Sequence, residues 1–405
     1  MRLKRNLHHL AASARAMALL MLVPTVCHAG GFALNEFSAR GNAMGGAVIA
    51  LPADASTVIY NPAGITQLPG TRTMVGVTAI APTADVHAGS GSKTTLQTNV
   101  YTPPHAFLTH QLSDTTWLGV GTYTRFGLGT QFGYEWAGTT KTYKAELASY
   151  SFAANIAFKL TDKLSFAVGP EIIYSSADLR KRPTSTTDMR MIVDGVGIGA
   201  QAALHYVFND QWSAGFVYHS TQKQSDSGHV HYTEIIAPPL VLRNQALTIR
   251  MDLPASYSLG LGYKPNSDWK IEADAVFTQW EDYKKLRYDF ENQADVTSLK
   301  NWRNTWRFQL GAEYMATDWL ALRGGFVWDQ DPIRRGYEDY MLPTNDRKIY
   351  SLGFGIIDDK LTYDFSLMYL INNDRSMDSN PNLAGATKIT NSKAYMAGFS
   401  IGYTF

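Results

Sequence analysis

This sequence has almost no cysteine, no long apolar run and no excess of either charge. A single cysteine, Cys27, in 405 residues excludes a disulfide-stapled fold. No stretch approaches the ~18 consecutive apolar residues of a transmembrane helix. The 36 Lys and Arg nearly balance the 35 Asp and Glu, so the charge does not point to nucleic acid as a partner. If such a chain spans a membrane, it must do so as closed β-structure, because only helices and barrels satisfy their backbone in lipid.

The first 29 residues have the composition of a secretory signal peptide. Four basic residues and an apolar stretch at 16–26 precede a small-residue cleavage site that ends at Ala29. The alternative is a lipoprotein acylated at Cys27, which the large Val26 before it disfavours. Cleavage after Ala29 removes the only cysteine and four of the 36 basic residues, which leaves 32 against 35 acidic ones. We therefore predict export to the bacterial envelope.

The last eleven residues, 395–405, alternate between an aromatic and apolar face and a face of small residues. Tyr395, Phe399, Tyr403 and Phe405 lie on the first face. In a soluble domain this strand would be an exposed, sticky edge. We expect it to be the last strand of a barrel, paired with the first strand, with its aromatic side in lipid. The terminal aromatic would also guide the chain to the barrel assembly machinery.

One turn signal recurs six times along the chain, as an Asp- or Asn-rich turn followed by Trp, Leu or Lys-Leu and an alternating run. The instances are "LSDTTWLGVG", "LTDKLSFAVG", "FNDQWSAGFV", "PNSDWKIEADAV", "ATDWLALRGG" and "IDDKLTYDFSL". Longer polar stretches separate them, at 83–97, 128–142, 178–190, 223–243, 291–300, 330–345 and 372–390. Short turns at one end and long loops at the other are typical of outer-membrane barrels. Six short turns predict fourteen strands, with both termini on the periplasmic side.

Charged residues gather on the polar faces of several strands. They are Lys270, Glu272, Asp274, Arg307, Glu313, Arg323 and Asp329. A charge facing lipid near the membrane midplane costs about 2–4 kcal/mol, so these side chains should point into the lumen. A soluble β-sandwich would also alternate, but the signal peptide, the regular strands and the aromatic end favour an all-β, fourteen-stranded antiparallel transmembrane barrel over residues 71–405.

Residues 30–70 do not have the pattern of a strand. They are rich in Gly and Ala, contain Asn61-Pro62 and Leu68-Pro69-Gly70 as breakers, and favour short helices near 36–47 and 52–60. A disordered periplasmic tail is the alternative, and the many apolar residues argue against it. We predict a partly helical hatch that plugs the barrel from the periplasmic side.

Several motifs resemble those of the FadL/TodX-type family of outer-membrane transporters for long-chain fatty acids and other hydrophobic compounds. They are "GGFALNEFSARGNAMGGA" at 30–47, "NPAG" at 61–64, "RFGLGTQF" at 125–132, "LPASYSLGLGY" at 253–263, "FTQWEDYKKL" at 277–286, "WDQDPI" at 328–333 and "LPTNDR" at 342–347. Each is weak alone, but they keep the order of the family over the whole exported chain. The family fold is a fourteen-stranded barrel with an N-terminal hatch, which agrees with the strand count.

The resemblance implies passive import of a hydrophobic small molecule. The ligand enters near the extracellular loops, reaches an apolar pocket at the tip of the hatch, and leaves sideways beside a kinked third strand. That route avoids the lipopolysaccharide and keeps an apolar molecule on apolar surfaces. The implied protein is a monomer of the outer membrane that needs no cofactor.

The resemblance also assigns residues to this route. Phe32 matches an aromatic at the hatch N-terminus that lines the pocket, and Asp329 matches an acidic pocket residue, with Arg323 six residues earlier on the same face. A packing role for Phe32 and a plain ion pair for Asp329 are the alternatives. Asn61, Pro62 and Ala63 match the hatch motif and would dock the hatch.

The expected basic partners of a fatty-acid carboxylate do not align. Ser176 and Ser298 occupy those positions, with Arg180 and Lys300 nearby. A neutral aromatic hydrocarbon or alkane is therefore the alternative ligand.

The third strand, "LGVGTYTRFGLGTQF", holds four glycines, which weaken strand pairing and mark bulges. We expect the lateral gap at Phe126, Gly127 and Gly129. The alternative is that these are ordinary barrel glycines.

Other function classes fit less well. An outer-membrane hydrolase would need a Ser–His pair, and the sequence has no G-x-S-x-G. A general porin would need an open, charge-lined lumen, which an apolar hatch would block. His229 and His231 form an H-x-H in a presumed loop, a weak metal signal, so we predict neither an enzyme nor a metal site.

Overall fold

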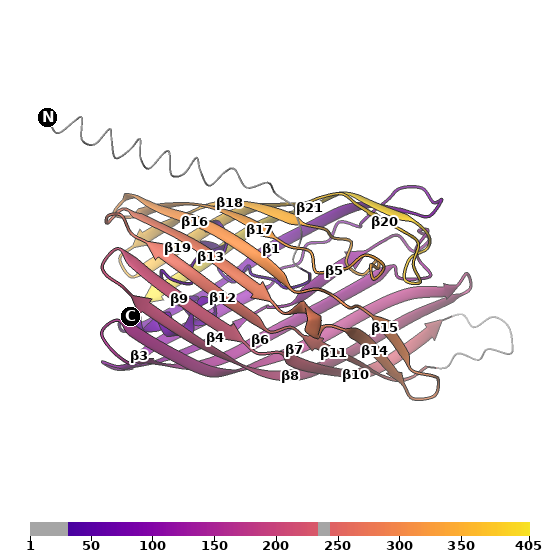
Figure 1. Ribbon diagram of the computed structural model, residues 1–405, viewed down its shortest axis with the longest axis horizontal. Coiled ribbons are helices and arrows are strands. Elements are labelled where there is room, and N and C mark those ends of the chain that lie inside the picture. The colour runs from indigo at the N-terminus through magenta and orange to yellow at the C-terminus, as the bar shows by residue number, and fades with distance from the viewer. Residues whose placement is uncertain (1–30, 234–243) are drawn as a thin grey trace.

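The computed structural model describes residues 31–233 and 244–405, which form a closed antiparallel β-barrel around the N-terminal part of the chain (Figure 1). The signal peptide predicted at 1–29 lies outside the described residues. The barrel closes where β1 (Thr71–Ala88) pairs with β21 (Thr387–Thr404), with Arg72 opposite Thr404. Within the described residues this closure leaves no free sheet edge, and the aromatic C-terminal strand is paired on both sides, with β1 and β19.

The wall has fourteen strands, several of them interrupted, which confirms the predicted fold class. After β1 they are β2 (Thr94–Thr95) with β3 (Pro104–Ser113), β4 (Thr116–Tyr123) with β5 (Gly127–Gln131), β6 (Lys144–Lys159), β7 (Leu164–Thr184), β8 (Thr187–Val207), β9 (Trp212–His219) with β10 (Gln222–Thr233), β11 (Gln245–Leu253) with β12 (Ser256–Tyr263), β13 (Trp269–Thr278) with β14 (Lys285–Phe290), β15 (Val296–Leu299) with β16 (Thr305–Thr317), β17 (Leu320–Asp329), β18 (Arg347–Asp358), β19 (Leu361–Asn372) with β20 (Arg375–Met377), and β21.

All six short turns fall where the repeated turn signal predicted them, for example between Asp358 at the end of β18 and Leu361 at the start of β19. The prediction of a long loop at 178–190 was wrong. There β7 and β8 continue as a paired hairpin up to Thr184 and Thr187. The many polar residues of this stretch are typical of a loop. In the structure they alternate with Leu179, Met189 and Met191, which are buried inside the barrel, so the stretch forms strands.

The stretch 223–243 was also only partly a loop. Residues 223–233 belong to β10, and 234–243 lie outside the described residues. His229 and His231 are therefore on a strand rather than in a loop, both exposed, with ring centroids 6.2 Å apart. Among the described residues no group of three or more metal-binding side chains gathers.

The outer face of the barrel is apolar. Phe152 and Ile156 on β6 and Val168 and Ile172 on β7 are all 37% or more exposed, while their neighbours along each strand face inward. Aromatic pairs such as Trp212 with Tyr263, at 4.3 Å between ring centroids, lie beside the short turns. An apolar band with aromatic residues at its border is the surface that a bilayer requires. In the described part of the chain, no helix has both the length and the apolar composition needed to cross a membrane.

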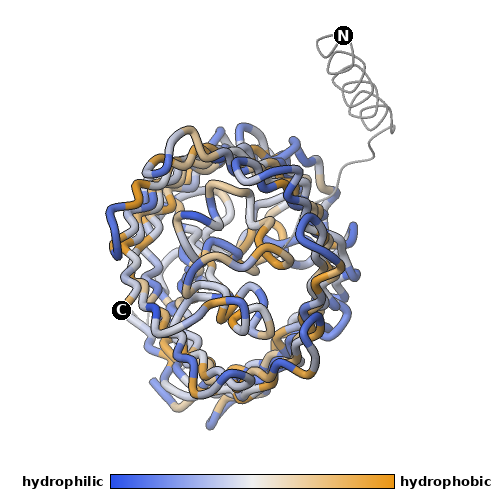
Figure 2. Tube along the Cα trace, turned by 90° about the vertical axis from the view of Figure 1, so that its left-hand side faces the viewer, coloured by the Kyte–Doolittle hydropathy of each residue, from blue (hydrophilic) through white to orange (hydrophobic). Residues whose placement is uncertain are grey.

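Residues 31–70 fold inside the barrel, and Figure 2, a view along its axis, shows chain crossing the interior of the ring. The segment contains α2 (Ala39–Ala43), α3 (Thr57–Tyr60) and the 3-10 helix η1 (Pro62–Gln67), all shorter than the helical pieces expected. Ser38 caps α2, because its hydroxyl accepts a hydrogen bond from the Gly41 N–H at 3.1 Å. Residues 37–51 are buried without a break. We call residues 31–70 the hatch.

Candidate functional site

The wall is broken in its third strand, between the end of β4 at Tyr123 and the start of β5 at Gly127. The first residues of the hatch occupy the break. The Leu34 N–H donates to the Arg125 carbonyl at 2.8 Å, and the Gly127 N–H donates to the Phe32 carbonyl at 3.0 Å. Ala33 and Phe126 form the bridge between these two bonds. A short piece of the hatch therefore does the pairing that a neighbouring strand does elsewhere.

A buried carboxylate fixes the backbone at the break. Glu171 on β7 is fully buried and binds the Arg125 guanidinium at 2.5 Å. It also accepts hydrogen bonds from the Tyr123 hydroxyl at 2.8 Å and the Gln222 amide at 2.9 Å. Since Arg125 carries the carbonyl that Leu34 binds, Glu171 positions one half of the bridge.

An aromatic cluster surrounds Phe32. Its ring centroid lies 5.0 Å from that of Trp280, 5.5 Å from Tyr283, 5.6 Å from Trp302 and 5.8 Å from Phe126. Trp280 starts the short helix η2 (Trp280–Asp282), which follows β13. Tilted and edge-on rings at these separations attract one another beyond their buried area. These apolar contacts therefore hold residues 31–36, which we call the tip of the hatch, against the segments between β13 and β16.

Three cavities follow one another from the extracellular end to the break, and they share lining residues. The outer cavity, about 490 Å³, shares Leu179, Lys300, Asp339 and Met341 with the middle cavity, about 50 Å³. The middle cavity shares Phe32, Leu128, Leu147 and Leu342 with the inner cavity, about 330 Å³. The middle cavity is thus the narrow connection between two larger spaces.

The inner cavity reaches the membrane face of the barrel. Its lining includes hatch residues 31–34, Gly127 to Gly129 of β5, and Tyr150 of β6. Tyr150 is 48% exposed on the outer wall. A Cβ added to Gly127 would lie 2.8 Å from the Leu34 side chain, and one added to Gly129 would lie 2.1 Å from the Tyr101 ring. These glycines leave open the space between hatch and wall. Of the three expected gap residues, Gly127 and Gly129 line this cavity, while Phe126 lines a separate small cavity of about 70 Å³.

Polar groups are few in the middle cavity. Lys300, 3% exposed, pairs with Asp339 at 2.5 Å, and the other Asp339 oxygen accepts the Met341 N–H at 2.9 Å. Lys300 lies in the loop after β15. Burial there would lower the pKa of its ammonium, but attraction to Asp339 outweighs burial, so the pKa is raised and the group stays charged. The rest of the lining is mostly aliphatic and aromatic.

Asp329 and Arg323 face the lumen but do not share partners. Asp329 binds Arg307 at 3.1 Å and Arg347 at 2.8 Å. It borders a small fourth cavity of about 70 Å³ that also touches Ala33 and Phe126. Arg323 instead binds Glu313 and Asp364 and lines none of these four cavities. Six residues of strand separate them by about 20 Å. The alternation therefore predicted that both side chains face the lumen, but it could not show that they bind different partners.

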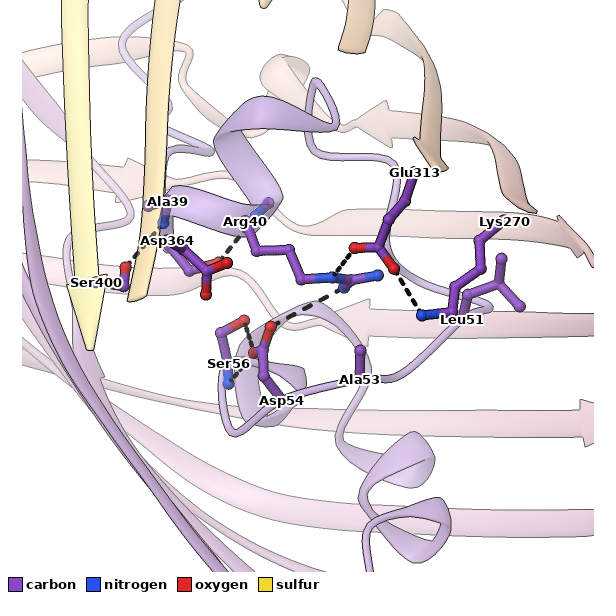
Figure 3. A network of polar contacts seen from close by, with 12 residues as sticks. Ala39, Arg40, Leu51, Ala53, Asp54, Ser56, Lys270, Glu313, Asp364 and Ser400 are labelled. Atoms are coloured by element: carbon purple, nitrogen blue, oxygen red, sulfur yellow. Dashed lines mark hydrogen bonds and ion pairs between the residues drawn. The ribbon is translucent and has the colours of Figure 1, made fainter. Parts of the chain in front are cut away.

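The remaining lumen charges hold the hatch, as Figure 3 shows around Arg40. Arg40 binds Glu313 at 2.9 Å, and Lys270 binds the other Glu313 oxygen at 2.6 Å. Glu272 accepts the N–H groups of Ala50 and Leu51 at 2.5 and 2.9 Å. The alternation predicted that these charges face inward. It gave no sign that they would bind the backbone and the arginine of the hatch.

The hatch motif is also in contact with the wall. The Asn61 amide donates to the carbonyls of Ile49 at 2.8 Å and of Leu204 on β8 at 3.2 Å. Its oxygen accepts the Ala63 N–H, and Pro62 occupies the first position of η1, where no N–H is needed. Asn61 thus joins two hatch segments to the barrel.

Sequence reasoning missed Glu171, Trp302 and Asp339. Trp302 stands in "NWRNTW", where two tryptophans in a polar loop could have suggested a buried aromatic site. Nothing in the sequence pairs Glu171 with Arg125, because 46 residues separate them.

Comparisons with known proteins agree with this geometry. A family model described as "Outer membrane protein transport protein (OMPP1/FadL/TodX)" matches residues 20–405. The chain is 22% identical over 453 aligned residues to a long-chain fatty acid transport protein of Escherichia coli O6:H1, covering 97% of this chain and 98% of that one.

Two solved structures share the fold. A Pseudomonas aeruginosa FadL homologue is 20% identical with a TM-score of 0.84, covering 93% of this chain and 100% of its own. The Pseudomonas putida toluene transporter TodX is 19% identical with a TM-score of 0.75, covering 92% and 99%.

Proposed function

Because the chain belongs to the outer membrane protein transport family (OMPP1/FadL/TodX), we propose that it is a passive uptake channel of the outer membrane that releases hydrophobic compounds sideways through its wall. The substrates are long-chain fatty acids or other hydrophobic compounds. The relatives' names include both a fatty-acid transporter and a toluene transporter, and aromatic hydrocarbons or alkanes are the alternative class. We propose no enzymatic activity for it.

One observation carries this proposal: the three cavities lead from the extracellular end to a break in the wall, where hatch residues 32–34 and the Ser149 side chain bind the backbone in place of a neighbouring strand. An apolar molecule is stabilised at each step by the apolar surface that it buries against these linings, by roughly 25 cal/mol per Å². An exit into water through the hatch would expose this apolar surface again and lose that stabilisation. The apolar route therefore ends in the membrane.

Each predicted site residue has a place in this scheme. Phe32 stands between the middle and inner cavities, Gly127 and Gly129 line the proposed exit, and Phe126 pairs with Ala33 beside it. Asp329 lies beside the tip of the hatch and Arg323 in the network that holds its body. We assign residues 30–70 to the hatch, docked through Asn61, Pro62 and Ala63, and 71–405 to the barrel. We further propose that it works as a monomer surrounded by lipopolysaccharide.

The test fills the exit. In a Gly127→Val/Gly129→Val variant the added side chains would meet Leu34 and Tyr101, so we expect uptake of a labelled hydrophobic compound by cells to fall at least tenfold while the barrel still folds. Gly133→Val is the matched control, because its Cβ would have nothing within 4 Å. Heat-modifiable migration on gels checks that both variants are folded. Full uptake by the double variant would overturn the lateral route.

A general porin is the second candidate function, and it would conduct ions with the hatch in place. If the hatch fills the lumen, single-channel ion conductance in planar bilayers should be near zero and should rise when residues 31–70 are deleted. Porin-like conductance of the intact protein would contradict the proposed function.

A further inference from the structure

The middle cavity contains three charged side chains, which together carry a net negative charge. They are Lys300, Asp339 and Asp226. Lys300 and Asp339 neutralise each other at 2.5 Å. Asp226 on β10 is 1% exposed, and no cation lies among its hydrogen-bond partners in the described chain.

Asp226 has one oxygen occupied and one available. Its Oδ2 accepts the Ser175 hydroxyl at 2.7 Å. Its Oδ1 is buried without a hydrogen-bond partner among the described residues. A buried acceptor left unpaired costs about 1–3 kcal/mol, and a ligand that donates an O–H or N–H to it recovers that cost.

The ammonium of Lys300 is not free to bind an acid. A ligand carboxylate would have to compete with Asp339, which is already in place and is held by the Met341 N–H. It would also bring a like charge close to Asp226 in a space with little water. Uncompensated like charges in a low-dielectric site repel strongly.

We propose that Lys300, Asp339 and Asp226 make the middle cavity a charge filter, which passes uncharged apolar ligands, favours those with a hydroxyl donor and rejects carboxylates. The position suits a filter, because this cavity of about 50 Å³ joins spaces of about 490 and 330 Å³. The inference rests on the proposed function and narrows its substrate class to neutral compounds.

Three ligands with one skeleton test the filter: toluene, benzyl alcohol and benzoate. Titration calorimetry of the full chain in lipid nanodiscs at neutral pH, with empty nanodiscs subtracted, gives the affinities. We expect the wild type to bind benzyl alcohol most tightly, toluene next, and benzoate at least about tenfold more weakly than toluene.

Removing the charge of Asp339 should reverse the discrimination. In Asp339→Asn, Lys300 becomes a buried unpaired cation, so benzoate should bind at least about tenfold more tightly than in the wild type, with toluene unchanged. Asp226→Asn should reduce the advantage of benzyl alcohol over toluene by about threefold or more, because the acceptor is then neutral. Asp378→Asn is the matched control, since Asp378 is exposed and pairs with Arg335. It should change none of the three affinities.

A variant that removes the whole pair covers the case in which Asp339→Asn does not fold. Lys300→Met/Asp339→Leu should still bind toluene and still reject benzoate, and tight benzoate binding there would overturn the filter. Equal affinities of wild-type protein for benzoate and toluene would overturn the filter alone. If none of the three ligands binds, the filter fails, while the proposed function is judged separately by the uptake measured for the Gly127→Val/Gly129→Val variant.

Discussion

The two ends of the hatch are held in different ways. The body, residues 37–68, is buried except at 52–54 and 67, and Arg40, Ala50 and Leu51 bind carboxylates of the wall. The tip, residues 31–36, is held by two backbone hydrogen bonds at the break, by a hydrogen bond from Arg347 to the Ala33 carbonyl at 3.4 Å, and by the aromatic contacts of Phe32. Residues 33–36 are partly exposed.

This difference indicates which part of the plug can move. Withdrawing the body would take Arg40 away from Glu313 and the Ala50 and Leu51 N–H groups away from Glu272, which leaves buried charges short of partners at several kcal/mol each. Releasing the tip breaks two neutral hydrogen bonds, each worth about 0.5–1.5 kcal/mol net, the long hydrogen bond from Arg347 to the Ala33 carbonyl, and the ring contacts. We therefore expect the body to stay seated while the tip opens and closes the exit.

Breaking the anchor of the body should have the largest effect. In Glu313→Ala, the buried Arg40 and Arg323 lose their shared carboxylate, so we expect a loss of about 3–5 kcal/mol of stability. Ion conductance should appear as the body loosens. Urea titration of the heat-modifiable band and bilayer recordings measure the two effects.

Glu281→Ala is the matched control, because Glu281 is 53% exposed and pairs with the exposed Arg334. It should change neither property. A wild-type conductance in Glu313→Ala would show that the body is held without this network.

Fixing the tip sharpens the comparison from the other side. A Leu34→Cys/Gly127→Cys variant adds two cysteines to a mature chain predicted to have none, at positions whose side chains would touch. Under oxidation we expect uptake of a labelled hydrophobic compound to stop, and reductant should restore it. Each single-cysteine variant is the control. Unchanged uptake by the cross-linked form would mean that the tip does not move during transport.

Loosening the tip should have a smaller effect. Phe32→Ala removes the ring that contacts Trp280, Tyr283 and Trp302, so the amides of Leu34 and Gly127 should exchange hydrogen at least about tenfold faster, as 1.4 kcal/mol of lost contact implies. Amides of residues 39–50 should keep their protection. Loss of protection in both parts would show that tip and body form one unit.

The smallest change is expected at Asp329, which borders the cavity beside the tip. Asp329→Asn keeps an oxygen acceptor for Arg307 and Arg347, so stability should fall by less than about 2 kcal/mol. Ligand affinity should change a few-fold because a charge beside the tip is lost. If neither neutral nor acidic ligands bind differently, Asp329 is only a member of an ion pair.

The parts of the fold that local chemistry sets could be predicted from the sequence. Turn residues and alternation of period two fixed the six turns and the strand count, since both depend on neighbours in the chain. The sequence did not predict the hairpin of β7 and β8. Leu179, Met189 and Met191 line the outer cavity, and the sequence does not reveal that this cavity exists.

The pairs of the site lie beyond local chemistry. Arg323 binds Glu313 because the register of β16 and β17 places them opposite each other, and a shift of one residue would turn both to the other face. Lys300 and Asp339 meet because two extracellular loops fold together. Such contacts depend on the whole barrel, so a residue can be placed on the correct face while its partner is unknown.

The closure of the barrel between β1 and β21 also sets an order of assembly. Helix α2 packs against β17, β18, β19 and β21, and the Ala39 N–H donates to Ser400 on the last strand at 2.9 Å. Residues 39–43 of α2 therefore acquire these partners only when the last strands have been exported and folded. Contacts between such distant parts of a chain form late and slowly. A chain that stalls before β21 would thus have neither a closed wall nor a seated plug, so an open, leaking pore is not an intermediate of this pathway.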